Sequence, residues 1–246
     1  MSAEELAQLA RALGDPAHGH AILAEGNISM LLDDSTMLVK ASGTSLGGTT
    51  AASFLRVRID DALALLDRPP AAEAEHAAAL DACVDGDSEL RPSVETPMHA
   101  AVLRHGGARF VGHTHPQAVN SILCSQNAAL VTRALFPEQV VVCGADPLFV
   151  PYVDPGLQLA RTIRDLLTER ERPPQVVYLQ NHGLVALGRS AEHVLQITQM
   201  AVKAAAILLG ALAAGGPVFL SDEEVARIDE RLDEHYRRQV LAGRNE

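Results

Sequence analysis

The chain has 246 residues, 48% of them hydrophobic, so it can bury a sizeable core and is not expected to be disordered. Its 20 lysines and arginines are outnumbered by 31 aspartates and glutamates, which gives a formal net charge of −11. This balance disfavours DNA, RNA and anionic membranes as partners, because their phosphates attract basic surfaces. A small phosphate is not excluded, since backbone N–H groups bind it locally.

Cysteine usage and hydropathy indicate a soluble cytoplasmic protein. The three cysteines lack C-x-x-C spacing and are expected to be reduced and mostly buried: Cys83, Cys124 and Cys143. The N-terminal M-S-A-E-E lacks the positive start and apolar stretch of a signal peptide. The most apolar region, 194–213, is interrupted by Gln196, Gln199 and Lys203, which argues against a membrane span.

The first half of the chain predicts a helix, a hairpin, a strand and two further helices. Ser2 and Glu5 form a capping-box pattern ahead of Leu6, Leu9 and Leu13, which is typical of a short amphipathic helix. The hairpin is expected to pair 28–32 with 36–41, and the alternating strand is expected at 54–59. The two further helices are expected at 73–85 and 95–104.

The second half alternates predicted strands and helices. Strands are expected at 108–114, 140–143, 176–180 and 184–187, and helices are expected to begin at Pro116, Asp154-Pro155, Ser190 and Ser221. The helix from Ala191 is apolar almost all round, so we expect it to be buried on more than one side, either in the domain core or at a subunit interface. Helices alternating with strands and hairpins predict an α/β fold of three αβα layers, with a central mixed, largely antiparallel sheet covered by helices, in a single domain over 1–246.

The strongest chemical signal is the sequence F-V-G-H-T-H-P at 110–116. In a strand, residues i and i+2 point to the same face, so His113 and His115 present two imidazoles together. Two neutral imidazoles suit Zn²⁺, Mn²⁺, Fe²⁺ or Co²⁺. Taken alone, however, the spacing is a weak signal, and ordinary strand histidines are commoner.

Two further segments carry candidate ligands. In Q-N-H-G at 180–183, the glycine permits a sharp turn that leaves His182 exposed at a strand end. Glu95 lies at a predicted helix start, where the helix dipole favours a carboxylate. By themselves these residues are typical of a turn histidine and a capping acid. Together with His113 and His115 they form the three-histidine set and nearby carboxylate that a catalytic metal needs.

The remaining histidines are weaker candidates. His99 follows Glu95 by four residues, so it either supports the acid from the same helix face or simply packs. The others lie in polar or helical contexts and are expected at the surface: His18, His20, His76, His105, His193 and His235.

Two Gly/Ser-rich segments, 25–29 and 41–48, are candidate phosphate-binding loops. Their small residues let backbone N–H groups approach an anion, and Asn27 and Ser42 add side-chain hydrogen bonds. As isolated signals they are ordinary loops, and they fit neither the Walker pattern nor the dinucleotide-binding G-x-G-x-x-G.

Taken in order, G-N-I-S, S-G-T, P-S-V-E, H-T-H-P and N-H-G resemble the class II aldolase/adducin family over residues 26–188. The implied ligands of a divalent metal are His113, His115 and His182, with Zn²⁺ the usual ion and Mn²⁺, Co²⁺ or Fe²⁺ as alternatives. Glu95 is the implied catalytic acid/base, which can also ligate the metal at rest. The implied substrate- and phosphate-binding residues are Asn27, Ser42, Gly43 and Ser93.

The resemblance implies a metal-dependent aldolase of carbohydrate metabolism that forms a homotetramer. Such a lyase cleaves a ketose 1-phosphate or related sugar to dihydroxyacetone phosphate and a small aldehyde, through a metal-stabilised enediolate. The chain departs from the pattern at Val94, where fuculose-phosphate-type aldolases have a second serine, and this leaves room for a non-phosphorylated ligand. The family's aldolases also use a tyrosine as proton donor, and none is assigned among Tyr152, Tyr178 and Tyr236.

Three alternatives share the motif set. A pentulose-phosphate 4-epimerase and a methylthioribulose-phosphate-type dehydratase would use the same metal site. An adducin-like binding module would keep the fold without catalysis. The histidine triad and Glu95 argue against the binding module, because a scaffold has no need to place imidazoles together.

Overall fold

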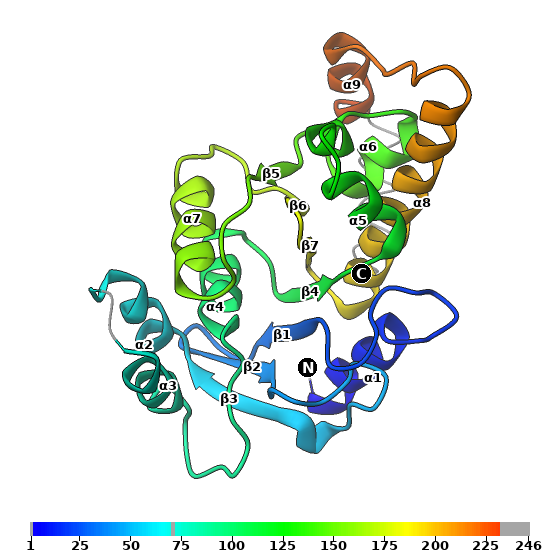
Figure 1. The fold of residues 1–246 in the computed structure, drawn as a ribbon. Coiled ribbons are helices and arrows are strands. Elements are labelled where there is room, and N and C mark those ends of the chain that lie inside the picture. Colours follow the sequence, from blue (N-terminus) through cyan, green and yellow to red (C-terminus); the bar gives the residue numbers. More distant parts are fainter. Residues whose placement is uncertain (1, 70–71, 232–246) are drawn as a thin grey trace. The chain divides into compact units, whose positions relative to one another are not determined.

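The computed structural model describes residues 2–69 and 72–231, which divide into two compact units (Figure 1). Unit 1 runs to Val111 and includes Val153–Pro173, and unit 2 comprises Gly112–Tyr152 and the chain from Pro174. Strand β4 (Phe110–Thr114) begins in unit 1 and ends in unit 2. The expectation of a single domain over 1–246 stays a prediction.

The described strands form a mixed sheet with the hydrogen-bonded order β3-β2-β1-β4-β7-β6-β5. The pairs β1–β2, β2–β3 and β6–β7 are antiparallel, and β5–β6 is parallel. The strand bounds besides those of β4 are Asn27–Leu31 (β1), Thr36–Lys40 (β2), Phe54–Arg58 (β3), Leu148–Val150 (β5), Val176–Leu179 (β6) and Gly183–Gly188 (β7). The predicted mixed, largely antiparallel sheet is therefore confirmed.

In unit 1 the hairpin β1–β2 pairs Met30 with Leu38, and β3 continues the meander by pairing Val57 with Met37. The sequence of β3 alternates as expected, because Leu55 and Val57 are buried whereas Arg56 between them is exposed. This pattern is typical of a strand with one face on the core.

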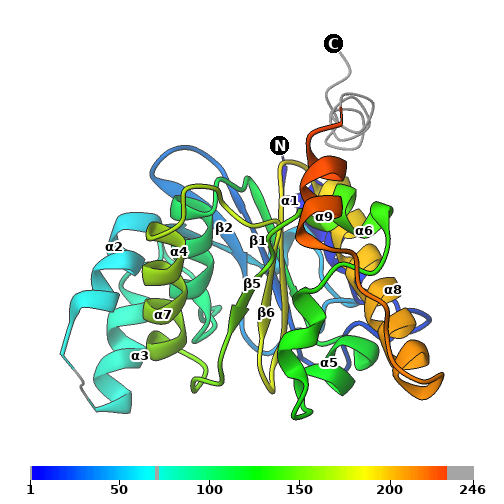
Figure 2. The ribbon, with the colours of Figure 1, turned by 90° about the horizontal axis from the view of Figure 1, so that it is seen from above.

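The helices of unit 1 cover both faces of these strands. Figure 2 shows α1 on one side of β1 and β2, and α2, α4 and α7 on the other. Ser2 caps α1 as predicted, since its Oγ accepts a hydrogen bond from the Glu5 N–H at 3.2 Å. The three layers are thus present in unit 1, whose helices are α1 (Ala3–Leu13), α2 (Ile59–Ala64), α3 (Glu73–Asp81), α4 (Thr96–His105) and α7 (Leu157–Thr168), with 3-10 turns at Ala51–Ser53 and Leu65–Asp67.

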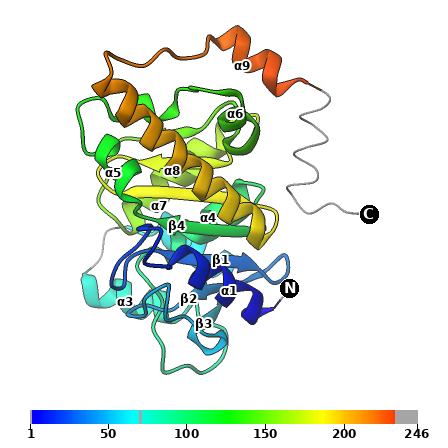
Figure 3. The same cartoon turned by 90° about the vertical axis from the view of Figure 1, so that its right-hand side faces the viewer.

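In unit 2 the long helix α8 contacts β7, α5 and α6, and α9 packs against α6 (Figure 3). Ser190 caps α8 by accepting from the His193 N–H, and Ser221 with Glu224 completes a capping box on α9. The helices in the described part of this unit are α5 (Gln117–Leu123), α6 (Pro137–Cys143), α8 (Ala191–Ala213) and α9 (Asp222–Asp229), with a 3-10 turn at Ala128–Thr132.

The strand predicted at 140–143 is wrong, because these residues form the end of helix α6. The β-branched run V-V-V favoured a strand, but Pro137 at the first helical turn starts a helix. Val140 and Val141 are buried in a cluster with Ile228 of α9. Packing therefore overrides the local preference of the valines.

Within this chain, helix α8 is buried on one face, so the expectation that the domain core or a subunit interface covers it on more than one side stays a prediction. Ile207 and Leu212 of its other face are 41% and 39% exposed. By length and composition this helix alone among the described residues would be apolar enough to cross a membrane, and core helices of soluble proteins also meet that test.

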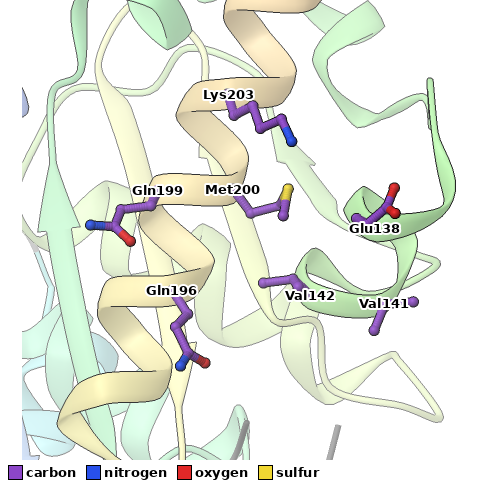
Figure 4. A pocket seen from close by; sticks show the side chains of 7 residues that line it. All are labelled: Glu138, Val141, Val142, Gln196, Gln199, Met200 and Lys203. Atoms are coloured by element: carbon purple, nitrogen blue, oxygen red, sulfur yellow. The ribbon is translucent and has the colours of Figure 1, made fainter. Parts of the chain in front are cut away.

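A pocket of about 310 Å³ lies between α6 and α8 (Figure 4), lined by Glu138, Val141, Val142, Gln196, Gln199, Met200 and Lys203. None of the predicted site residues lines it.

Candidate active site

The three predicted metal ligands converge within unit 2. His113 lies on β4, His115 follows that strand, and His182 lies in the turn between β6 and β7. The Nε2 atom of His113 is 3.0 Å from Nε2 of His115 and 3.3 Å from Nε2 of His182. One ligand atom from each residue lies within 4.8 Å of the others. The two strand ends therefore present three ring nitrogens to a common point.

These separations fit a divalent cation. Ligand nitrogens about 2.05 Å from a tetrahedral ion lie about 3.3 Å from one another. The ring planes of the triad cross at 66° to 83°, with centroids 4.8 to 5.0 Å apart, so each imidazole directs an edge rather than a face at its neighbours. Three neutral imidazoles leave at least one coordination position for substrate, as in catalytic metal sites.

Hydrogen bonds hold the triad in this orientation. The Nδ1 atom of the fully buried His113 lies 2.9 Å from the carbonyl oxygen of Leu184 on β7. Because a carbonyl only accepts, Nδ1 carries the proton and Nε2 keeps the lone pair that a metal requires. The side-chain amide of Asn120 on α5 donates to the carbonyl of His182 at 2.9 Å and anchors the turn between β6 and β7.

The glycine after His182 is needed for space rather than for the turn. The left-handed residue of the turn is Asn181, with φ of 56°, which corrects our explanation of the Q-N-H-G motif. A Cβ at Gly183 would lie 2.5 Å from the carbonyl oxygen of Thr114 and 2.6 Å from Cδ2 of His115. The absence of a side chain lets β7 approach the segment that carries the other two histidines.

Glu95 lies in unit 1 at the N-terminus of α4, but its side chain makes no capping hydrogen bond. Instead, Oε2 accepts from Nδ2 of Asn27 at 2.7 Å. The Glu95 N–H donates to Ser93 Oγ at 3.3 Å, so the serine secures the start of the helix. The interpretation as a simple capping acid is therefore wrong. The Glu95 residue is 9% exposed, and its carboxylate is held by Asn27 of β1.

A second buried histidine continues this contact. His99, one turn after Glu95 on α4, is hydrogen-bonded through Nε2 to Oδ1 of Asn27 and through Nδ1 to Oγ of Ser29 at 2.7 Å. Both Asn27 and Ser29 lie on β1, where residues two apart share a face. Of the two expectations for His99, support of the acid is the one that these contacts favour.

The predicted phosphate-binding residues Ser42, Gly43 and Ser93 come from neighbouring backbone segments of unit 1. Ala41 and Pro92 form an isolated antiparallel bridge, and the Ser42 N–H donates to the carbonyl of Arg91 at 2.9 Å. Gly43 has φ of 83° and open space around its Cβ position, so it serves the loop conformation. The structure thus brings the loop after β2 beside the loop before α4, while Asn27 is joined to the latter through Glu95.

Lys40, at the end of β2, was missed by the sequence analysis. It is 2% exposed, and its Nζ donates to the carbonyls of Ala41 at 3.2 Å and Thr44 at 2.6 Å. Burial lowers the pKa of Lys40, and the negative charge of Glu95 opposes that shift. The signal available in the sequence was a lysine in an otherwise apolar strand pattern, two residues before Ser42 of the S-G-T turn.

Other expectations had mixed outcomes. His20 and His193 are 3% and 8% exposed, so their assignment to the surface is wrong, whereas His235 lies outside the described residues.

Cys124 is exposed, although Cys83 and Cys143 are buried as predicted. Among the candidate proton donors, Tyr178 is buried, Tyr152 is 55% exposed and Tyr236 lies outside the described residues. Val94, beside Glu95, is 63% exposed.

Residues 4–209 match the family model of the class II aldolase and adducin N-terminal domain, so the chain belongs to this family. Members of the family are generally dependent on a divalent metal, bind sugar phosphates and often form oligomers, and they include lyases and related enzymes. The histidine cluster of unit 2 agrees with that metal dependence.

Relatives within the family differ in activity. The chain is 31% identical over 162 residues to the uncharacterized oxidoreductase YuxG of Bacillus subtilis strain 168, covering 66% of this chain but only 22% of that protein. It is 29% identical over 178 residues to 3-oxo-tetronate 4-phosphate decarboxylase of Escherichia coli strain K12, covering 71% of each. A solved L-fuculose 1-phosphate aldolase shares the fold, with a TM-score of 0.72, 20% identity and coverage of 94% of this chain and 95% of that one.

Proposed function

We propose that this protein is a divalent-metal-dependent carbon–carbon lyase that cleaves a ketose 1-phosphate or a related sugar to dihydroxyacetone phosphate and a small aldehyde. The observation that carries the proposal is the convergence of the Nε2 atoms of His113, His115 and His182, at spacings that suit a catalytic cation. Zn²⁺ is the proposed ion, with Mn²⁺, Co²⁺ and Fe²⁺ as alternatives.

The reaction needs an electron sink and a proton-transfer group. When bound, the cation would act as a Lewis acid on the negative charge that develops on the substrate oxygen as the carbon–carbon bond breaks. The breaking bond leaves its electron pair on the ketone-bearing fragment, and the other fragment departs as an aldehyde as its hydroxyl gives up its proton to water. Glu95 would deliver a proton to the carbon that received the pair, and would remove it in the aldol direction.

The loops of unit 1 would bind the substrate phosphate. The backbone N–H groups and small side chains of these loops suit an anion, and the proposed contacts are Asn27, Ser42, Gly43 and Ser93. Val94 supplies no hydroxyl where fuculose-phosphate-type aldolases have one, so we expect a weaker phosphate contact or a differently substituted ligand. The proposed protein is a cytoplasmic homotetramer without nucleic-acid or membrane partners.

A decarboxylase is the second candidate, and the similarity to the Escherichia coli 3-oxo-tetronate 4-phosphate decarboxylase favours it. Loss of CO₂ from a 3-oxo acid leaves an electron pair at the carbon beside the ketone, as aldol cleavage does. The same groups would serve: the cation for the developing charge, and Glu95 for protonation of the carbon. The two activities therefore differ in the group that leaves.

The test measures metal content first and the shared proton-transfer step second. Protein purified without chelator should hold about one divalent ion per chain by mass spectrometry. When dihydroxyacetone phosphate is incubated with the protein in D₂O, it should exchange one carbon-bound hydrogen for deuterium. Proton NMR would measure the rate of this exchange. Replacing Glu95→Gln should preserve the metal, because the three histidines remain, and should slow exchange about 10²- to 10⁴-fold.

Product analysis then separates the candidates. Ketose 1-phosphates should release an aldehyde, whereas a 3-oxo acid 4-phosphate should release CO₂, and the faster reaction identifies the activity. A wild-type protein that binds no metal after incubation with Zn²⁺, Mn²⁺ and Co²⁺ would overturn the proposal in favour of an adducin-like binding module. Full exchange activity in Glu95→Gln would overturn the role of Glu95.

A further inference from the structure

Four buried polar side chains form a continuous hydrogen-bonded chain within unit 1, in the order Ser29, His99, Asn27 and Glu95. Their exposed fractions are 0%, 0%, 4% and 9%. We propose that His99 is a positioning residue, which fixes the orientation of the Asn27 amide so that its N–H group faces the Glu95 carboxylate. This inference rests on the proposed role of Glu95 in proton transfer.

When His99 is neutral, the chemistry of the four groups permits one direction of donation. A carboxylate only accepts, so Asn27 presents Nδ2 to Oε2 of Glu95, at 2.7 Å. The amide oxygen of Asn27 then faces His99, whose Nε2 must donate. In the neutral imidazole, Nδ1 of His99 is then an acceptor, and the Ser29 hydroxyl donates a hydrogen bond to it at 2.7 Å. The ionised carboxylate, the amide orientation and one histidine tautomer are mutually dependent.

His99 supplies orientation that Asn27 lacks by itself. An asparagine amide rotated by half a turn has nearly the same shape, but it would point its oxygen at the carboxylate of Glu95. His99 opposes that rotation, because its Nε2–H would then face an N–H group. His99 is itself fixed one turn along α4, where its backbone N–H donates to the Glu95 carbonyl at 3.1 Å. Buried groups in such networks are costly to leave unpaired.

Two substitutions at the same position separate positioning from packing. In His99→Gln the side-chain amide nitrogen reaches about as far as Nε2 and can still donate to Asn27. In His99→Asn the amide reaches only as far as Nδ1, so the donor to Asn27 is lost. We expect hydrogen exchange of dihydroxyacetone phosphate to slow about 10- to 100-fold in His99→Asn. In His99→Gln the exchange rate should stay within about fivefold of the wild-type rate. The loss should fall on kcat, with KM little changed.

His193 provides the matched control, because it is a buried histidine of α8 outside this chain of side chains, with Nδ1 accepting from the Arg189 N–H. His193→Gln and His193→Asn should not differ in exchange rate at neutral pH. Equal rates in His99→Gln and His99→Asn, or a full wild-type rate in His99→Asn, would overturn the positioning role.

Nitrogen-15 NMR tests the hydrogen-bonded chain without activity. In the metal-loaded wild type, His99 should be the neutral Nε2–H tautomer at pH 7.5, and Ser29→Ala should shift the tautomer balance with little change in fold. One Asn27 side-chain N–H should exchange slowly with solvent. An Nδ1–H tautomer or a doubly protonated His99 in the wild type would overturn the inference. Absence of wild-type exchange with dihydroxyacetone phosphate would instead count against the proposed function, and the NMR result would still decide the arrangement of the four groups.

Discussion

The two units hold their polar site residues in different ways. In unit 1, donors and acceptors alternate from Ser29 to Glu95, so the carboxylate is fixed by partners that the chain itself supplies. In unit 2, three Nε2 atoms face one another, and the proton of His113 is on the far side of its ring, against Leu184. Two lone pairs turned toward each other repel unless a proton or a cation lies between them. This difference agrees with the roles proposed above, proton transfer for Glu95 in unit 1 and cation binding for the histidines of unit 2.

The largest effect is expected from breaking the triad with His113→Ala. Bound metal should fall from about one ion per chain to less than about a tenth, and exchange of dihydroxyacetone phosphate should fall at least about 10³-fold. Treatment with EDTA should lower the Tm of the wild type and leave that of the variant unchanged, because only a protein that binds the ion is stabilised by it.

The control for this change is His18→Ala, which removes an exposed histidine of unit 1. It should retain the metal and the response to EDTA. Undiminished metal in His113→Ala would contradict the assignment of the triad.

A smaller effect is expected from Gly183→Ala, which leaves every ligand in place. Its Cβ would enter the space between Thr114 and His115, so the imidazole must shift. We expect metal affinity to fall about 10- to 100-fold, with about 1–3 kcal/mol lost from the free energy of unfolding. Competition with a fluorescent zinc chelator and urea denaturation would measure the two quantities.

Gly210→Ala is the matched control, since this glycine lies within α8 and its Cβ would meet nothing within 4 Å. It should keep the metal affinity and raise the free energy of unfolding by about 0.5–1 kcal/mol, because alanine is favoured within helices. If the two variants bind metal equally well, the close approach of β7 has no role in ligand placement.

Lys40→Met in unit 1 tests whether the two units have separate roles, phosphate binding in unit 1 and metal binding in unit 2. The change removes the ammonium that holds the Ala41 and Thr44 carbonyls beside the predicted phosphate loop. We expect the Kd for inorganic phosphate, measured by calorimetry, to rise about tenfold, while metal content stays unchanged. Lys203→Met, which removes an exposed lysine of α8 at the pocket between α6 and α8, is the control and should not alter phosphate binding. A fall in metal content without loss of phosphate affinity would contradict this division of roles.

The smallest effect is expected from His193, whose pKa is lowered to about 4 chiefly by burial and further by the charge of Arg189. In the unfolded chain its pKa returns to about 6.5, so below that pH the unfolded state takes up a proton that the native state refuses. The free energy of unfolding should therefore decrease as pH falls from about 6.5 to about 4.

We expect the wild type to lose about 1–2 kcal/mol more than His193→Gln over this interval, after allowance for residual solvent screening. Urea denaturation at pH 7.5, 5.5 and 4.5 would measure the difference. Parallel losses in the two proteins would show that His193 does not contribute to the acid sensitivity.

Much of the fold followed from local patterns. Serine caps located the starts of α1, α8 and α9, and alternation located β3, because these signals depend on neighbouring residues alone. Helix α6 was missed because its valines favour a strand until they are packed against Ile228, some ninety residues later. Short strand β5 was missed because its pairing with β6 is not visible in three residues.

The candidate site divides in the same way. The H-x-H spacing predicted that His113 and His115 share a strand face, and their convergence with His182 agrees with the grouping that the motifs suggested. The need for Gly183 was misread, because the atom that excludes a side chain is the carbonyl of Thr114 in a distant segment. The partners of His99 could not be predicted for the same reason, since Ser29 and Asn27 lie about seventy residues away.

The contact between His113 Nδ1 and the Leu184 carbonyl has a consequence for how such a chain can diverge. It ties a ligand to the backbone of β7, the strand that directly follows His182, so ligand orientation depends on strand register rather than on any exchangeable side chain. Loops elsewhere can then accumulate substitutions and select new substrates while the ion-binding geometry is inherited unchanged. A histidine that the sheet itself orients can thus serve reactions that differ in the group that leaves, as the two proposed activities do.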